Sequence, residues 1–360
     1  MITSELIFLI SFIIFIMGIL AFDLLFVGRK SHIVSFKEAM TWSIVWIGVA
    51  GAFYFVILYF GEKIHGIETF EDLQVVVSKY APEIKLNPDN FQESITMYRK
   101  TMAINYLTGY LIEETLSIDN LFVIFMILTA FSVKLRDYKP ILFWGILGAI
   151  VLRFIFIFAG SALIQRFDWI LLIFGGWLVF SGLKMFIQRN KVEKIEPQNN
   201  KFVIFLSKYF NVFPRYVGQR FFVRRNHKLY ITPLFIVLLY VEFSDLIFAF
   251  DSIPAIFSVT RDPYVVFFSN IFAIVGLRSL FFLLIRVIDM FHHLKTGISF
   301  LLVFVGLKLL LHSWLEEIGY KSVYSLYIIL TILVGSILFS VIFPAKAKEE
   351  GGITGGGLPV

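Results

Sequence analysis

Two acidic motifs lie inside long apolar runs of this sequence. The second motif reads EFSDLIFAFDSIP (residues 242–254) and carries Glu242, Asp245 and Asp251. A carboxylate at the depth of a bilayer centre costs at least about 3 kcal/mol on insertion scales. Acids in such a position therefore predict a functional site, where a partner, a proton or a bound cation neutralises the charge.

The first motif reads EETLSIDN (residues 113–120) and matches the second in its order of side chains. It supplies Glu113 and Asp119, and Asn120 follows Asp119 as Ser252 follows the last acid of the second motif. Carboxylate, amide and hydroxyl oxygens are the ligands of hard divalent cations such as Mg²⁺, Ca²⁺ and Mn²⁺. The two motifs together therefore predict a cation site built only from oxygen.

Softer metals fit this sequence poorly. The chain has no Cys, so it has neither disulfides nor thiolate metal sites. Its six His lie in expected loops or at helix ends, where we expect them to be interfacial or solvated: His32, His65, His227, His292, His293 and His312.

Two arginines, Arg153 and Arg278, lie near the middle of expected membrane helices. They are outnumbered by five acids, which are Glu113, Asp119, Glu242, Asp245 and Asp251. Protons or a cation must neutralise most of the remaining negative charge. We therefore favour a cation site, and two alternatives stay open, structural ion pairs and proton-coupled transport without a metal. Glu114 lies off the repeated pattern and is a candidate supporting charge.

The spacing of the acids constrains their geometry. Positions i and i+6 differ by about 240° around a regular helix, so Asp245 and Asp251 do not share a face. The same holds for Glu113 and Asp119. Pro254 can kink the second helix. We therefore expect a broken helix, whose unwound carbonyls add oxygen ligands and bring the separated acids together.

The composition describes an integral membrane protein. Of 360 residues, 58% are hydrophobic and only 16% are charged, against about 25% in soluble domains. The net charge of +6 does not indicate nucleic-acid binding, because the basic residues lie between apolar runs. No phosphate-binding loop and no hydrolase motif such as G-x-S-x-G or H-E-x-x-H occurs, so we expect no enzyme activity.

The apolar runs predict an all-α polytopic membrane protein with nine spanning helices. Their expected ranges are 5–27, 42–60, 103–131, 140–163, 169–187, 231–258, 264–288, 297–314 and 323–343. Lys and Arg gather in alternate loops, most strongly in residues 188–230, which predicts an external N-terminus and a cytoplasmic C-terminus. That basic loop contains either a short helix on the membrane surface or a solvated linker, and we expect the tail 346–360 to be a linker.

An internal repeat divides the chain. WGILGAIVLR (144–153) resembles SNIFAIVGLR (269–278), and LVFSGLK (178–184) resembles LVFVGLK (302–308). Each copy spans three helices, 103–187 and 231–314. Because three is odd, the second copy must be inverted, as in secondary transporters with an ion site where the repeats meet. Residues 1–102 then hold two helices and an external segment, and 315–345 one last helix.

These motifs resemble the TerC family of integral membrane proteins, which includes Alx-type manganese exporters. The resemblance rests on TGYLIEETLSIDNLFV (108–123), FWGILGAIVLR (143–153), the stretch 242–282 and residues 22–47. It implies a cation efflux protein of the bacterial inner membrane, with Mn²⁺ as the preferred ion and Ca²⁺ as its rival. It also implies that the five acids, with Asn120 and Ser252, are the functional residues. Glu114 departs from the family pattern, and so does segment 61–102, which is longer than usual.

The expected partners follow from this interpretation. They are a divalent cation, protons that exchange for it, and membrane lipids, with no nucleic acid and no permanently bound cofactor. A homo-oligomer or a membrane-protein partner stays open. The family is also linked to tellurium resistance and to membrane insertion or secretion, so an accessory factor without direct transport is the alternative function.

Overall fold

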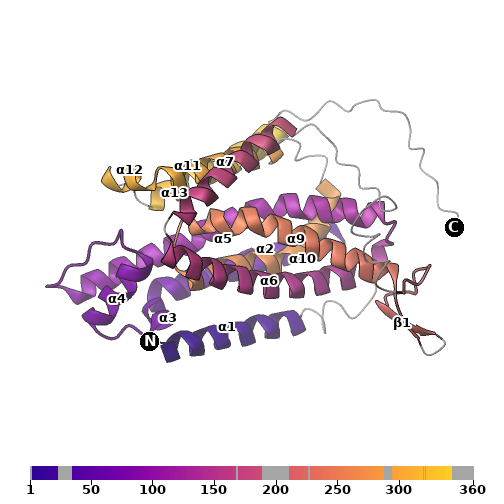
Figure 1. Cartoon of the computed structure of the whole chain (residues 1–360), viewed down its shortest axis with the longest axis horizontal. Coiled ribbons are helices and arrows are strands. Elements are labelled where there is room, and N and C mark those ends of the chain that lie inside the picture. The colour runs from indigo at the N-terminus through magenta and orange to yellow at the C-terminus, as the bar shows by residue number, and fades with distance from the viewer. Residues whose placement is uncertain are drawn as a thin grey trace.

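The computed structural model describes residues 2–22, 35–167, 169–188, 211–225, 228–287, 294–318, 320 and 322–342. This part of the chain is mostly helical (Figure 1). The one sheet among these residues is an antiparallel hairpin of β1 (Phe222–Arg225) and β2 (Lys228–Ile231). The expected all-α membrane architecture is confirmed.

The helices follow the expected order. They are α1 (Ile2–Phe22), α2 (Phe36–Phe60), α3 (Glu62–His65), α4 (Phe70–Tyr80), α5 (Phe91–Ala130), α6 (Tyr138–Arg166), α7 (Ile170–Gln188), α9 (Pro233–Phe257), α10 (Pro263–Val287), α11 (Leu294–Leu310), α12 (His312–Glu317) and α13 (Ser322–Ile342). Seven described helices are long and apolar enough to cross a membrane: α1, α2, α6, α7, α9, α10 and α13. With α5, which carries the first acidic motif, and the shorter apolar helix α11, the nine spans stay a prediction.

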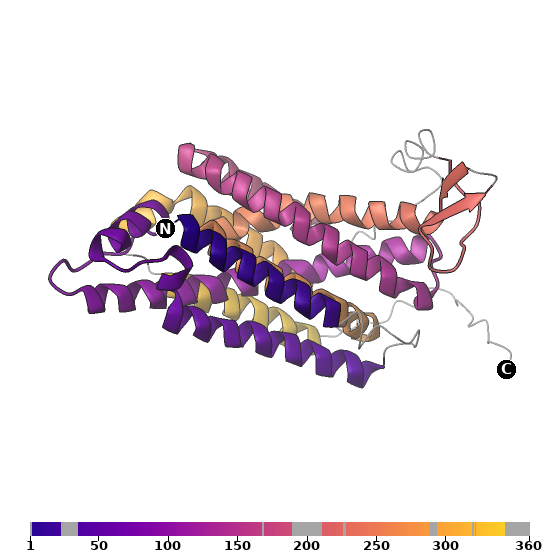
Figure 2. The same ribbon diagram turned by 90° about the horizontal axis from the view of Figure 1, so that it is seen from below.

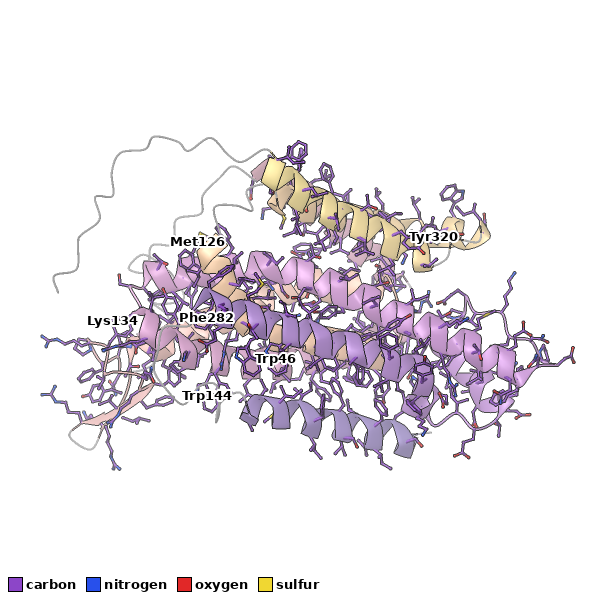
Figure 3. The ribbon with its side chains drawn as sticks, turned by 180° about the vertical axis from the view of Figure 1, so that it is seen from behind. Trp46, Met126, Lys134, Trp144, Phe282 and Tyr320 are labelled. Atoms are coloured by element: carbon purple, nitrogen blue, oxygen red, sulfur yellow. The ribbon has the colours of Figure 1, made fainter. Side chains whose placement is uncertain are left out.

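The long helices run between two distinct ends of the molecule. The short helices α3, α4 and α12 lie at one end, called the α4 end, and the hairpin lies at the opposite end, called the β1 end (Figures 1 and 2). Tyr320 marks the first end and Lys134 the second (Figure 3).

Two groups of helices make up the bundle. Helices α7, α11 and α13 lie along one side, over the group formed by α1, α2, α5, α6, α9 and α10 (Figure 1). Within the larger group α10 packs against α2, α5 and α6, and it is the most buried of the spanning helices. Its Phe267 and Phe268 are buried against Phe12 of α1, so aromatic side chains fix these helices relative to one another.

Helices α7 and α11 cross at glycines. A Cβ added to Gly306 would lie 2.7 Å from the carbonyl oxygen of Gly175, and a Cβ added to Gly182 would lie 2.8 Å from that of Ser299. The repeat pairs Gly182 with Gly306 and Gly175 with Ser299, each 124 positions apart. Each contact is therefore the image of the other with the copies exchanged. The inverted repeat stays a prediction, which this reciprocal crossing supports.

Two expectations about the long helices are wrong. Helix α5 begins at Phe91 instead of 103, because the side chain of Asn90 accepts a hydrogen bond from the amide of Glu93 and caps the helix there. The expected break near the acids is absent from both α5 and α9, which run uninterrupted over their described lengths. Pro254 lies in the last turn of α9. The backbone hydrogen bond that it removes is therefore close to the end of the helix, and the helix does not break.

Segment 61–102, which we expect to be external, is folded. Thr69 and Asp72 form a capping box at the start of α4, and Leu73, Val76 and Tyr80 are buried beneath it. His65 is fully buried, so the expectation of an interfacial or solvated position is wrong for this histidine. The expectations for His32, His227, His292, His293, most of loop 188–230 and the tail 346–360 fall outside the described residues, as does the side chain of His312.

Candidate functional site

A buried arginine joins four helices at the centre of the bundle. Arg153 of α6 has no exposed surface, and its Nη2 donates to Oδ1 of Asp245 on α9 at 3.1 Å. Its Nη1 donates to the carboxylate of Glu113 on α5 and, at 3.0 Å, to Oδ1 of Asn270 on α10. We call these four residues the Arg153 centre.

The partners of Arg153 are also bonded to one another. Asn270 donates through Nδ2 to Oε2 of Glu113 at 2.9 Å, and Ser117 donates to Oε1 at 3.1 Å. Glu113 therefore accepts bonds from three side chains, which is what a buried carboxylate requires. Two carboxylates face one guanidinium, so the Arg153 centre has a formal net charge of −1 when both acids are ionised.

The local sequence explains why Arg153 points inward. Ile146, Ala149, Arg153 and Ile157 are buried on α6, at intervals of three and four residues that place them on one face. On α5, Glu113 and Ser117 are four positions apart and share a face in the same way. Arg153, Glu113 and Ser117 thus lie on the faces of α6 and α5 that pack into the interior, so they are buried with the apolar residues around them.

Two more acids lie close to this centre. The carboxylate of Glu242, one turn before Asp245 on α9, lies against Gly148 of α6, in space that any Cβ at that position would occupy. Glu114 forms a hydrogen bond with the Tyr110 hydroxyl. One oxygen of each carboxylate, Oε2, is buried without a hydrogen-bond partner among the described residues.

Asp251 lies in different surroundings. Trp177 of α7 donates through its indole nitrogen to Oδ1 of Asp251 at 2.6 Å, and Ser181 donates to the same oxygen at 3.0 Å. The structure thus brings Glu113 and Asp245 together and directs Asp251 to α7. The side chain of Asp119 is outside the described part of α5. No group of three His, Asp or Glu side chains arranged to hold a metal ion occurs in the described portion of the chain.

The buried polar atoms that lack a partner are concentrated on two helices. Within the described residues, all of them belong to α5 or α9: they lie on Tyr98, Asn105, Glu114, Asn120, Glu242 and Ser252. Asn120 and Ser252, which the repeat pairs, are both in this set. Buried polar groups without protein partners require water or an ion, so the repeat-related helices α5 and α9 are where such species would bind.

A small cavity adjoins the Arg153 centre on the side of the β1 end. Its volume is about 30 Å³, and Asp245 and Arg278 contribute its charged side chains. The other lining residues, which include Leu121, Gly145 and Val241, lie nearer the β1 end than the centre does. A water molecule needs about 10–15 Å³ of such space, so the cavity has room for about two waters beside Asp245.

A second charged cluster at the α4 end was missed by the sequence analysis. His65 of α3 lies 2.7 Å from Oε1 of Glu5 on α1 and 2.8 Å from Oδ2 of Asp262, which precedes α10. Tyr264 donates to the other oxygen of Glu5 at 3.0 Å. Burial opposes the charged imidazolium, but Asp262 and Glu5 outweigh it and raise the pKa of His65 to about 9. We call Glu5, His65 and Asp262 the His65 cluster.

Comparison with known proteins decides the family. Residues 98–348, more than half of the chain and including both acidic motifs, match the family described as integral membrane protein TerC family. The chain belongs to the TerC family. The resemblance noted from the sequence is thereby confirmed.

Curated relatives cover most of the chain. A protein of Escherichia coli K12 called putative membrane-bound redox modulator Alx is 40% identical over 302 residues, 84% of each chain. An uncharacterized membrane protein of Myxococcus xanthus is 39% identical over 332 residues, 92% of this chain and 91% of that protein. One from Rickettsia bellii is 36% identical over 335 residues, 92% of this chain and 97% of the relative. No solved structure matches the chain.

Proposed function

We propose that this TerC-family protein exports a divalent metal cation, with Mn²⁺ as the best candidate, in exchange for protons. The observation that carries the proposal is the convergence of Glu113 and Asp245, from the two acidic motifs, on the buried Arg153. Buried acids in excess of basic partners need a cation or protons to neutralise them.

The Arg153 centre supplies a plausible exchange chemistry. A divalent cation would compete with the guanidinium for the oxygens of Glu113 and Asp245, and Asn270 offers a further oxygen. When the cation leaves, Arg153 and protons would neutralise the carboxylates again. Proton release on binding and proton uptake on release would then couple the two fluxes. Glu242, beside Asp245, would serve as a further ligand or proton acceptor.

The cavity beside Asp245 supports entry of the ion from the side of the β1 end. It lies on the side of the β1 end, where the basic loop 188–230 begins and ends. By the distribution of Lys and Arg, that end would face the cytoplasm. Export would then carry the ion towards the α4 end, and the usual inside-negative potential opposes this movement, so coupling is required.

The remaining candidates have narrower roles in this proposal. Asp251 would form the contact between the central helices and α7, because its partners Trp177 and Ser181 lie there. Asn120 and Ser252 would contribute oxygens along the path. Asp119 keeps its predicted role as a ligand, and Arg278 would balance charge in the cavity.

Other functions have less support. Ca²⁺ suits the same oxygens and remains the rival ion. The relatives' name, redox modulator, does not extend to thiol chemistry on this chain, because it contains no Cys. An accessory factor for insertion, secretion or tellurium resistance would need no acids in the interior, where Glu113 has no exposed surface.

The proposal is tested by ion flux in liposomes. The purified protein is reconstituted, and Mn²⁺ entry is followed with a metal-sensitive dye, with and without a pH gradient. We expect flux in the wild type and its loss in Glu113→Gln and Asp245→Asn. Glu71→Gln, an exposed acid on α4, is the matched control and should transport normally. Absence of both Mn²⁺ and Ca²⁺ flux in the folded wild type would refute the proposal.

A further inference from the structure

Tyr98 and Asn105 lie on α5 between the two charged clusters. Both side chains are fully buried, yet the Tyr98 hydroxyl and both polar atoms of Asn105 have no hydrogen-bond partner among the described residues. Their spacing of seven residues places them on one face of the helix, about 10 Å apart along its axis. Such groups in a packed interior indicate bound water.

One end of this polar row reaches the His65 cluster. The Tyr98 hydroxyl lies within electrostatic range of Asp262, Glu5 and Glu62, without a hydrogen bond to any of them. Glu5 is the partly exposed member of the cluster, with 15% of its side chain accessible, whereas His65 and Asp262 have none. Glu5 is therefore the point at which this row meets its surroundings.

Several other charged or titratable groups face the cluster. Lys79 of α4 acts on Glu5, the ring of Tyr80 packs against His65, and Tyr264 bonds Glu5. Glu62 of α3 is paired with Arg99 of α5 at 2.6 Å. Glu62 thus has its own basic partner in Arg99, and His65 is paired with Glu5 and Asp262.

The other end of the row lies towards the Arg153 centre. Asn105 is eight residues, about 12 Å along the helix, from Glu113. Between them α5 approaches α10 at Gly109, where a Cβ would lie 2.9 Å from the Ser269 hydroxyl. The next residue, Asn270, donates to Glu113. Hydroxyl and amide groups thus occur at intervals between Asp262 and Glu113.

We propose that Glu5, His65, Asp262, Tyr98 and Asn105 form a water-linked proton path from the α4 end to Glu113. This inference rests on the proposed proton-coupled export and adds a separate route for the proton. The metal would enter through the cavity near the β1 end, while the proton arrives along the face between α5 and α10. Each proton that leaves the path at the Arg153 centre is replaced by one that enters at Glu5, so the number of protons on His65 stays unchanged.

Two tyrosines on α5 provide a matched test. Tyr98→Phe removes a hydroxyl without a protein partner, so a purely structural role predicts no effect. Tyr106→Phe, the control, removes an equally buried hydroxyl that donates to the carbonyl of Ala50 on α2 at 3.0 Å, away from the path. Proteoliposomes are loaded with a pH-sensitive dye and a Mn²⁺ gradient is imposed. Mn²⁺ binding to each purified variant is measured separately by electron paramagnetic resonance.

We expect Tyr98→Phe and Asn105→Leu to lower Mn²⁺-driven proton flux about tenfold while Mn²⁺ binding stays within twofold of the wild type. Tyr106→Phe should keep wild-type proton flux. Wild-type exchange that persists in Tyr98→Phe and Asn105→Leu would overturn the path and leave the proposed export intact. A wild type that moves no protons with Mn²⁺ would overturn coupled export itself, and the path with it.

Discussion

Asp245 and Asp251 lie on one helix, six residues apart, and have contrasting partners. Asp245 is bonded to a buried guanidinium shared with Glu113, whereas Asp251 accepts from the uncharged donors Trp177 and Ser181. The difference follows from helix geometry, since this spacing turns the two acids about 240° apart. Asp245 therefore belongs to the Arg153 centre, and Asp251 to the contact with α7.

The largest effect is expected from removing the charge that holds the centre together. Arg153→Gln leaves Glu113 and Asp245 buried without their basic partner, which should lower the free energy of unfolding by about 3–5 kcal/mol. Arg166→Gln, an exposed position at the end of the same helix, should change it by less than about 0.5 kcal/mol. Thermal unfolding in detergent measures both. Equal stability of Arg153→Gln and the wild type would show that the centre is not held by this charge.

The His65 cluster tests whether a second buried ionic group also stabilises the fold, as the Arg153 centre is expected to do. Because its pKa is raised from 6.5 to about 9 in the folded protein, His65 contributes stability that is complete below about pH 6.5. That contribution, roughly 3 kcal/mol, is lost as the pH rises through about 9. Melting curves from pH 6 to 10 should show the loss. The same curves for His65→Gln should lack it, and a parallel decline in this variant would contradict the assignment.

A smaller loss of stability is expected from the crossing of α7 and α11, which positions α7 for its contact with Asp251. Gly182→Ala forces a Cβ against the backbone of Ser299 on α11 and should destabilise the protein by about 1–3 kcal/mol. Gly176→Ala, on the same helix with open space around it, should be neutral or slightly stabilising. Unfolding midpoints of the two variants measure the difference. Similar midpoints in the two variants would mean that α7 and α11 do not cross closely at Gly182.

The smallest effect is expected at Asp251 itself. Asp251→Asn keeps an oxygen that accepts from Trp177 and Ser181, so stability should change by less than about 1 kcal/mol. Asp245→Asn should cost more, because it weakens the bond to a charged guanidinium. Chemical unfolding of the two variants, compared side by side, provides the test. A larger loss in Asp251→Asn would reverse the comparison.

Much of the fold could be predicted from the sequence because apolar runs and loop charges are local signals. Boundaries such as those of α9 and α10 lie within two residues of expectation. The early start of α5 was missed, because its first turns are polar and its cap at Asn90 resembles any loop residue. The predicted break in α9 was wrong because it overestimated the effect of Pro254, which lies in the final turn of the helix.

Part of the site could be predicted from the internal repeat, which is also visible in the sequence. The repeat pairs Glu113 with Asp245, and the structure brings these two together at Arg153. Asn270 was missed, although a lone amide in an apolar run was a usable signal. His65 and Glu5 are 60 positions apart, and neither has a motif, so only the folded chain could reveal their contact.

The most direct test of the central claim is Mn²⁺ binding by electron paramagnetic resonance to Asp245→Asn and Asp251→Asn beside the wild type. Even outer contacts of a metal site change affinity by about 10–100-fold. The account predicts at least about a tenfold loss of affinity in Asp245→Asn and a change below about threefold in Asp251→Asn. Wild-type affinity in Asp245→Asn, or an equal loss in both variants, would contradict it.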